Sequence, residues 1–248
     1  MNFEQFKTPP RDLELMPDEI HVWSASLDQP DSCREMLYET LSQDERDRAK
    51  RFVFERDRRR FAACRGMLRS IIARYLDVKA DSISFYYGLN GKPTLDISKG
   101  GEVLCFNLSH SEGLALYVFT RNSEVGVDVE YMRKLYEIER IAEHIFSQNE
   151  IEVFRSLPEE KKKEAFFTGW TRKEAIVKAL GDGLSIPLDA FDISFYQGRQ
   201  SKVTGTEGDS DETSSWFIYD LKPALGYAGA FAVKSNVFVT SCWQWEIN

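Results

Sequence analysis

The chain has 248 residues, enough for one large domain or two small ones, and its 42% hydrophobic content excludes a disordered chain. The net charge of −8 excludes a global electrostatic attraction to nucleic acid or to an anionic membrane. The four cysteines are far apart and form no C-x-x-C pair, so a zinc site is not expected. The sequence shows no signal-peptide pattern and no apolar run of membrane-spanning length, so we expect a cytoplasmic protein with free thiols.

The first third of the chain predicts one strand followed by three helices. Residues 20–26 alternate weakly between apolar and polar and predict the strand, and residues 31–40 predict the first helix. Ser42 begins the second helix, because Ser42-Gln43-Asp44-Glu45 has the chemistry of a helix N-terminus. Residues 61–76 carry apolar side chains at helical spacing and predict the third helix.

Between the second and third helices lies a strongly basic segment. Residues 46–60 hold eight basic and three acidic side chains, interrupted by Phe52-Val53-Phe54, which we expect to be buried. Burial of these three would fix the arginines on either side, and fixed guanidinium groups suit a phosphate ligand. A solvated helix face explains the charges equally well, and both interpretations stay open.

The middle of the chain predicts short strands joined by tight turns. Residues 82–87 predict a strand, and residues 88–93 a turn that exposes Lys92. Residues 103–108 and 114–120 predict two strands that are joined by a hairpin loop over residues 109–113. His110 lies in that loop between two serines, and strand-end loops are where sites are commonly built.

Gly126-Val127-Asp128-Val129-Glu130 predicts a strand with a valine face and a polar face. On the polar face, Asp128 and Glu130 are about 7 Å apart, as residues i and i+2 of a strand are. A nearby cation would relieve the repulsion between these carboxylates. Gly126 beside them removes a side chain where a ligand can approach. Taken alone, this pentapeptide favours the simpler interpretation of a solvated strand face.

The rest of the chain predicts two long helices and several strands. The helices cover residues 134–154 and 164–180, with a solvated connection at 158–163 between them and a stop at Gly181. Residues 198–215 are polar, and we expect them to be a mobile excursion. The predicted strands occupy residues 185–196 after a turn, and residues 216–220, 227–234 and 237–245.

Glu174 and Lys178 stand out within the second of these helices. Phe166, Trp170, Val177 and Leu180 set its apolar face, and Glu174 lies at the margin of that face with Lys178 one turn further on. An ordinary i,i+4 ion pair is one interpretation. The other is a third carboxylate that reaches a cation held by Asp128 and Glu130, a ligand set that suits Mg²⁺ beside phosphates. The helical pattern leaves the two open.

A weak internal repeat indicates the fold. Residues 83–88 match residues 193–198 at an offset of 110, and each follows a long helix and precedes a strand that begins with glycine. We therefore expect an α+β fold of two similar lobes related by a pseudo-two-fold axis. Each lobe would be a small antiparallel sheet packed against a long helix. The predicted lobes are residues 1–122 and 123–248, with a ligand cleft between them.

Four motifs in this order resemble the Sfp-type 4′-phosphopantetheinyl transferases, over about residues 48–195. The motifs are Gly91-Lys92-Pro93, Phe106-Asn107-Leu108-Ser109-His110-Ser111, Gly126-Val127-Asp128-Val129-Glu130 and Trp170-x-x-Lys173-Glu174-Ala175-x-x-Lys178. The resemblance implies a monomer whose two lobes bind coenzyme A between them, with Mg²⁺ on the pyrophosphate. A serine of an acyl or peptidyl carrier protein then attacks the β-phosphorus, and 3′,5′-ADP leaves.

The resemblance also implies residue roles. Asp128, Glu130 and Glu174 match the metal carboxylates, and Glu174 also matches the general base. Lys178 matches a lysine that neutralises or protonates the leaving phosphate, so the implied catalytic set is Asp128, Glu174 and Lys178. The residues that match coenzyme A contacts are Arg48, Arg60, Lys92, Ser109, His110 and Lys178. The segment before Phe52 is arginine-rich where relatives often carry lysines.

Two other functions fit parts of the sequence. A Mg²⁺-dependent phosphohydrolase could use the same carboxylates on a small phosphoester. A nucleic-acid-binding protein could use Arg46–Arg60, although the net charge of −8 opposes this. For the transferase, we expect the carrier protein to dock near the Asp128 strand and residues 131–165.

Overall fold

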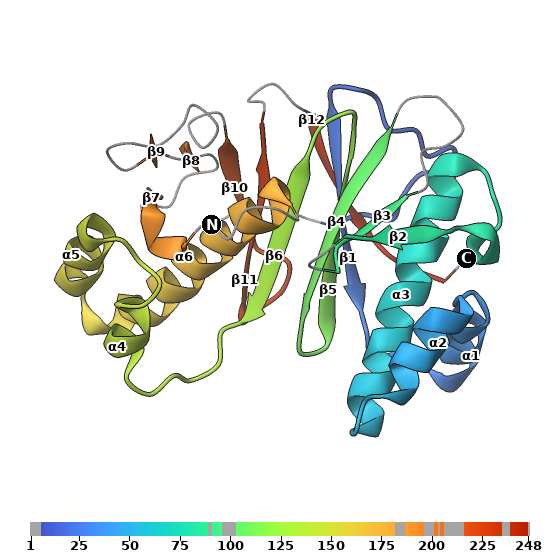
Figure 1. Cartoon of the computed structure of the whole chain (residues 1–248), viewed down its shortest axis with the longest axis horizontal. Helices are drawn as coiled ribbons and strands as arrows, with labels where there is room; N and C mark the ends of the chain where they lie inside the picture. The colour runs from blue at the N-terminus through green and yellow to red at the C-terminus, as the bar shows by residue number, and fades with distance from the viewer. Residues whose placement is uncertain are drawn as a thin grey trace.

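The computed structural model shows two lobes side by side, each with a long helix against the outer face of a small sheet (Figure 1). This arrangement confirms the predicted α+β class with two similar lobes. Among the described helices, none combines the length and the apolar character needed to cross a bilayer. The described residues are 6–88, 91–95, 103–181, 187–195, 201–202, 204–205, 216–234 and 239–247.

The first lobe has a sheet of order β12-β1-β5-β4, with all neighbours antiparallel except the parallel pair β12 and β1. The lobe boundary predicted from the sequence placed residues 123–248 in the second lobe. In the structure, strand β12 near the end of the chain pairs with β1 in the sheet of the first lobe. The elements of this lobe are β1 (Glu19–Ser26), α1 (Asp31–Glu39), α2 (Gln43–Lys50), α3 (Glu55–Leu76), β2 (Phe85–Tyr87), β3 (Pro93–Leu95), β4 (Leu104–Ser111), β5 (Leu114–Arg121) and β12 (Val239–Gln244).

The second lobe has an antiparallel sheet of order β6-β11-β10-β8. Its helix α6 corresponds to α3 of the first lobe, as the internal repeat predicts (Figure 1). The elements of this lobe are β6 (Val125–Tyr131), α4 (Ile138–Ala142), α5 (Gln148–Ser156), α6 (Glu159–Leu180), β7 (Phe191–Asp192), β8 (Ser201–Lys202), β9 (Thr204–Gly205), β10 (Phe217–Leu221) and β11 (Tyr227–Val233).

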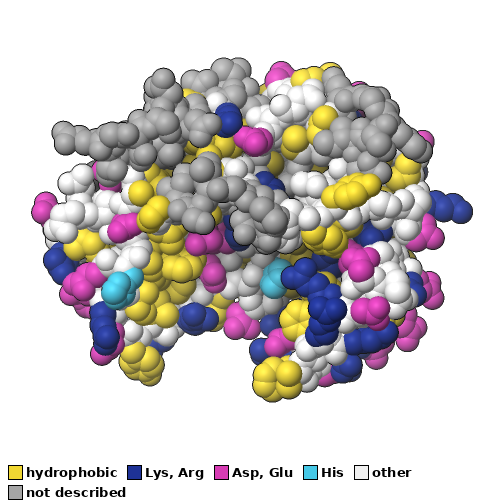
Figure 2. All heavy atoms as spheres, viewed as in Figure 1, with side chains coloured by type: hydrophobic (Ala, Val, Ile, Leu, Met, Phe, Trp, Pro, Cys, Tyr) yellow, Lys and Arg dark blue, Asp and Glu magenta, His cyan; other side chains and the backbone are white. Residues whose placement is uncertain are grey.

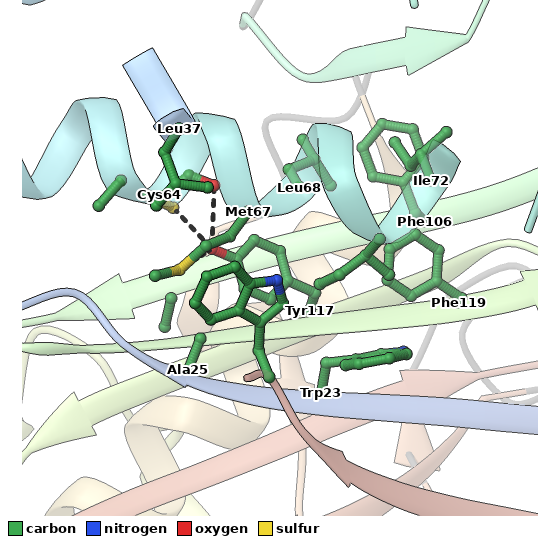
Figure 3. Packing of buried hydrophobic residues seen from close by; sticks show 14 of the residues in the cluster. Trp23, Ala25, Leu37, Cys64, Met67, Leu68, Ile72, Phe106, Tyr117 and Phe119 are labelled. Carbon is green, nitrogen blue, oxygen red and sulfur yellow. Dashed lines mark hydrogen bonds between the residues drawn. The ribbon is translucent and has the colours of Figure 1, made fainter. Parts of the chain in front are cut away.

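Of the apolar layers, two pack a long helix on the sheet of its own lobe, and one joins the two lobes. In the first, α3 covers its sheet, and Figure 3 shows Tyr117 pointing from β5 to α3, where its hydroxyl donates to Cys64 O at 2.9 Å. In the second, the inner faces of both sheets meet, and the valines of β6 pack there against Val22 and Val118. In the third, α6 packs on β10 and β11. The valine face of β6 is therefore buried, as its period-two pattern predicts.

The expected burial of Phe52, Val53 and Phe54 is wrong. Their exposed fractions are 38%, 89% and 68%. They occupy the break between α2 and α3, where none of the described helices or strands buries them, and Phe52 stacks on Phe61 at 5.2 Å between ring centroids. The arginines that flank the break are therefore not fixed by burial of this tripeptide.

Helix boundaries also differ from the pattern. The single helix expected over 134–154 is two short helices, α4 and α5, because Ser147 forms a capping box with Glu150 and begins a new helix. Helix α6 begins at Glu159 and not at Glu164, because Pro158 stands at its N-cap and Glu159 and Glu160 favour the first turn. The capping box at Ser42 and the stop at Gly181 are confirmed.

The predicted hairpin loop at 109–113 is also too long. Strand β4 runs to Ser111, so Ser109 and His110 are strand residues, and the turn is Glu112-Gly113, with Glu112 at φ 48°. The strand expected at 82–87 begins at Phe85. The excursion predicted over 198–215 and residues 196–198 of the internal repeat lie largely outside the described residues.

The group that approaches Gly126 is helix α6 and not a ligand, contrary to the prediction from the sequence. A Cβ atom on Gly126 would lie 2.1 Å from Ala175 O and 2.4 Å from Ala179 N, both on α6. The missing side chain therefore lets the backbone of α6 approach β6 closely. This contact places Glu174 and Lys178 of α6 over the polar face of β6.

Replacing Gly126 with alanine should push α6 away from β6. We expect Gly126→Ala to lower the free energy of unfolding by about 2–3 kcal/mol, because both clashing atoms are backbone. Gly229→Ala in the same lobe is the matched control, since its Cβ would lie 3.2 Å from the Leu116 side chain and 3.3 Å from Asp128 O. Urea unfolding measures both, and an equal loss in the two variants would contradict the close approach of α6.

Candidate active site

Side chains of β4 join the two lobes by hydrogen bonds to β6. Asn107 Oδ1 accepts from Val127 N at 3.0 Å, and Ser109 Oγ donates to Asp128 Oδ1 at 2.8 Å. Two residues further on, Ser111 Oγ donates to a carboxylate oxygen of Glu130 at 2.7 Å and accepts from Tyr131 N at 3.1 Å. β4 and β6 belong to different sheets, so these bonds replace a backbone ladder. We call this line of contacts the seam.

Lys178 of α6 reaches the seam from the other side. Its Nζ lies 2.6 Å from Asp128 Oδ1 and 2.9 Å from Ser109 Oγ. Asp128 is buried, and its second oxygen, Oδ2, has no hydrogen-bond partner among the residues that the structure describes. Lys92 from the β2–β3 hairpin donates to Lys178 O at 2.9 Å and so connects the first lobe to the same turn of α6.

The carboxylates at the seam lie in each other's field. Burial raises the pKa of Glu174, Asp128 and Glu130 raise it further, and Lys178 opposes them. Burial also raises the pKa of Glu130, where Ser111 opposes the shift and Asp128 adds to it. Glu174 on α6 and the two carboxylates of β6 are thus close enough for their charges to interact.

His110 follows Ser109 on β4 and borders the same region. The side chain is exposed, but the protein around it partly desolvates the imidazole and lowers its pKa, and the positive charges of Lys178 and Arg60 lower it further. A neutral imidazole keeps one nitrogen as a donor and one as an acceptor.

A cavity of about 480 Å³ lies beside the seam and between the lobes. Five of the predicted coenzyme A ligands line it: Arg48, Lys92, Ser109, His110 and Lys178. Aromatic side chains of Phe52, Phe61 and Tyr87 also line it, as do Val177 of α6 and Gly181 at the C-cap of that helix. Figure 2 shows a hollow between the lobes, with Lys and Arg gathered on the first-lobe side and Asp and Glu on the other. The volume suits a small-molecule ligand.

Arg60 is held away from this lining. Its guanidinium makes two 2.8 Å bonds to the carboxylate of Asp28 and one of 3.2 Å to Glu112 at the β4–β5 turn. A bidentate pair of this kind fixes the guanidinium firmly. Arg48 therefore lines the same cavity as Ser109 and Lys178 of the seam. Arg60 is bound instead to Asp28 and Glu112 of the first lobe.

The carboxylates do not yet form a closed metal centre. Among the described residues, no three His, Cys, Asp or Glu side chains converge as metal ligands do. Asp128 nevertheless offers an unpartnered buried oxygen, and Glu130 and Glu174 supply the hard oxygen donors that Mg²⁺ accepts. The donor set therefore fits a magnesium ion after a rearrangement of side chains.

Sequence reasoning missed a buried ion pair behind Glu174. Lys173 is completely buried, with its Nζ 2.8 Å from Glu150 and 2.6 Å from both Leu188 O and Phe191 O. Seven residues after Phe166, Lys173 lies only about 20° from it around the helix, so helical periodicity does place it on the buried face. Val177 and Leu180 of the expected apolar face are only half-buried. The pair anchors α6 at the residue next to Glu174.

Comparison with known proteins gives a consistent family. A model described as the 4′-phosphopantetheinyl transferase superfamily matches residues 124–232, and one described as 4′-phosphopantetheinyl transferase, N-terminal, matches residues 23–120. The chain is 40% identical to 4′-phosphopantetheinyl transferase HetI of Nostoc sp., over 95% of this chain and 96% of that protein. It is 27% identical to 4′-phosphopantetheinyl transferase Sfp of Bacillus subtilis, over 74% and 80% of the two chains.

Removing the cation beside Glu150 should be costly. Lys173→Met leaves a buried carboxylate without its partner and should lower the free energy of unfolding by about 3–5 kcal/mol. The double variant Lys173→Met/Glu150→Gln removes both charges and should recover part of that loss. Chemical denaturation of the two variants and the wild type gives the comparison, and a double variant less stable than Lys173→Met would contradict the pairing.

Proposed function

This chain belongs to the Sfp-type 4′-phosphopantetheinyl transferases, which transfer phosphopantetheine from coenzyme A to a carrier-protein serine, and we propose how its residues divide that reaction. Membership of this family replaces the phosphohydrolase and nucleic-acid-binding interpretations of the sequence. The observation that carries the proposal is the contact of Lys178 with Ser109 and Asp128, because it joins cationic, hydroxyl and carboxylate groups at the edge of the cavity.

Coenzyme A occupies the cavity, with its pyrophosphate at the Ser109 end. Lys92 and Lys178 supply positive charge there, and Ser109 and His110 supply hydrogen bonds to phosphate oxygens. Arg48, which lies over the ring of Phe61, supplies positive charge to the ligand further along the cavity. Two lobes contribute to this set, so the ligand stabilises their relative position when it binds. Arg60 belongs to the set only through the family resemblance, since Asp28 and Glu112 hold its guanidinium.

Asp128, Glu130 and Glu174 are the residues that would hold Mg²⁺. Oδ2 of Asp128, which lacks a hydrogen-bond partner within the described part of the chain, and the hard oxygen donors of the three carboxylates support this assignment. When bound, magnesium neutralises charge on the pyrophosphate and so helps the leaving group.

Glu174 is the base that we assign to the acceptor serine. It accepts the hydroxyl proton as the serine oxygen forms its bond to the β-phosphorus of coenzyme A. The bond from that phosphorus to the bridging oxygen breaks, and 3′,5′-ADP leaves with the bridging oxygen. Lys178 neutralises or protonates the departing phosphate. Alignment and charge neutralisation carry most of such a transfer at phosphorus.

The carrier protein approaches from the second lobe beside β6. Tyr131 at the end of β6 is 42% exposed and Tyr136 in the following loop is 77% exposed, with Met132 and Leu135 half-buried between them. Figure 2 shows hydrophobic side chains on the second-lobe side of the hollow. Exposed aromatic side chains of this kind are common in protein interfaces.

The transfer can be read directly by intact mass spectrometry. Incubation with coenzyme A, Mg²⁺ and an apo carrier protein should add about 340 Da to the carrier, the mass of the phosphopantetheine group. Glu174→Gln and Asp128→Ala should each abolish the gain without unfolding the protein. Glu35→Gln, which alters an exposed carboxylate on α1, is the control and should keep it. Near-full activity of Glu174→Gln or Asp128→Ala would contradict the role of that residue.

A further inference from the structure

A buried cluster of charges lies between α2 and α3 and reaches the cavity through Arg65. Glu45 of α2 accepts from Arg65 Nε and from Arg69 Nε, both at 2.6 Å. Both arginines lie on α3, and the exposed fractions of all three side chains are 7% or less. The roles assigned above to the seam use none of these three groups.

The cluster carries one uncompensated positive charge, because a single carboxylate faces two guanidinium groups. Arg69 ends in the protein interior, where its Nη1 donates to Ala80 O and Ile83 O. Arg65 instead lines the cavity. The excess charge is therefore available to a ligand only at Arg65.

Arg65 is also held in one orientation. Its Nη2 donates to the hydroxyl of Tyr87 at 2.8 Å, and its guanidinium lies over the ring of Phe85, 4.7 Å from the ring centroid. Contacts on Nε, on Nη2 and on the face of the group leave little freedom. A guanidinium fixed in this way at a cavity wall is suited to bind a phosphate.

The charges and aromatic rings near Arg65 indicate which part of coenzyme A would lie against this wall. Arg48, Phe52 and Phe61 line the cavity beside Arg65, so this end presents positive charge and aromatic rings. The pantetheine arm of coenzyme A carries no charge and no aromatic ring. The nucleotide arm carries an adenine ring and a 3′-phosphate, which match aromatic and basic side chains respectively.

We propose that Arg65, positioned by Glu45 and Tyr87, binds the 3′-phosphate of coenzyme A and makes the enzyme select coenzyme A over 3′-dephospho-coenzyme A. This inference rests on the proposed function, since it takes coenzyme A as the occupant of the cavity. Arg65 is the specificity-determining residue, and Glu45 and Tyr87 are positioning residues.

Kinetics with the two donors test this assignment. Arg65→Met keeps the side-chain volume and leaves Glu45 paired with Arg69, so the protein should fold. We expect KM for coenzyme A to rise about 10- to 100-fold, as the loss of a charged hydrogen bond implies, with kcat and KM for 3′-dephospho-coenzyme A unchanged. Tyr87→Phe should shift KM in the same direction by a smaller factor. Arg46→Met, one residue from Glu45 on α2, is the control and should keep the wild-type selectivity.

Binding gives a readout that does not depend on turnover. In calorimetry, Arg65→Met should weaken the binding of 3′,5′-ADP and leave that of 5′-AMP unchanged. If Arg65→Met does not fold, the same pair of ligands is measured with Tyr87→Phe. Equal losses for both ligands, no loss for either, or a wild type that uses both donors equally well would overturn the inference. A wild type that modifies no carrier with coenzyme A would instead overturn the proposed function.

Discussion

The side-chain hydrogen bonds between β4 and β6 form the contact on which the active site depends. Each of these strands lies at the edge of its own sheet, so its backbone groups need partners from outside that sheet. Asn107 and Ser111 meet that need for Val127 and Tyr131. Ser109 and Ser111 also bind the carboxylates of Asp128 and Glu130. The polar groups that join the lobes therefore also orient the candidate catalytic carboxylates.

The packing around the seam fixes these groups more firmly than the hydrogen bonds alone. The valines of β6 are clamped between the two sheets, and Gly126 lets α6 lie directly on the opposite face of the strand. Lys173 then ties α6 to Glu150 of α5 at the residue next to Glu174. Glu174 and Lys178 are thus presented from a rigid helix to a rigid strand, which is the preorganisation that transfer at phosphorus requires.

The sequence predicted the elements whose signals are local. The period-two valines of β6, the capping box at Ser42 and the stop at Gly181 need no tertiary information, and all three are confirmed. Phe52-Val53-Phe54 and Gly126 were misread because hydrophobicity does not report whether a second layer exists, and a missing side chain does not report which partner approaches. At the site, the sequence motifs singled out Ser109, His110 and Lys178, and all three line the cavity. The Glu45, Arg65 and Arg69 cluster was missed, because charges far apart in sequence give no pattern before the helices pack.

The central claim is that coenzyme A binds where the seam meets α6. A crystal structure of the protein with coenzyme A and Mn²⁺ in place of Mg²⁺ tests it, because the anomalous signal locates the metal independently of the ligand density. We expect the pyrophosphate to lie between Ser109 and Lys178, with one anomalous peak at the carboxylate of Asp128. Coenzyme A bound with its pyrophosphate away from the seam, or a metal without contact to Asp128, would contradict the account.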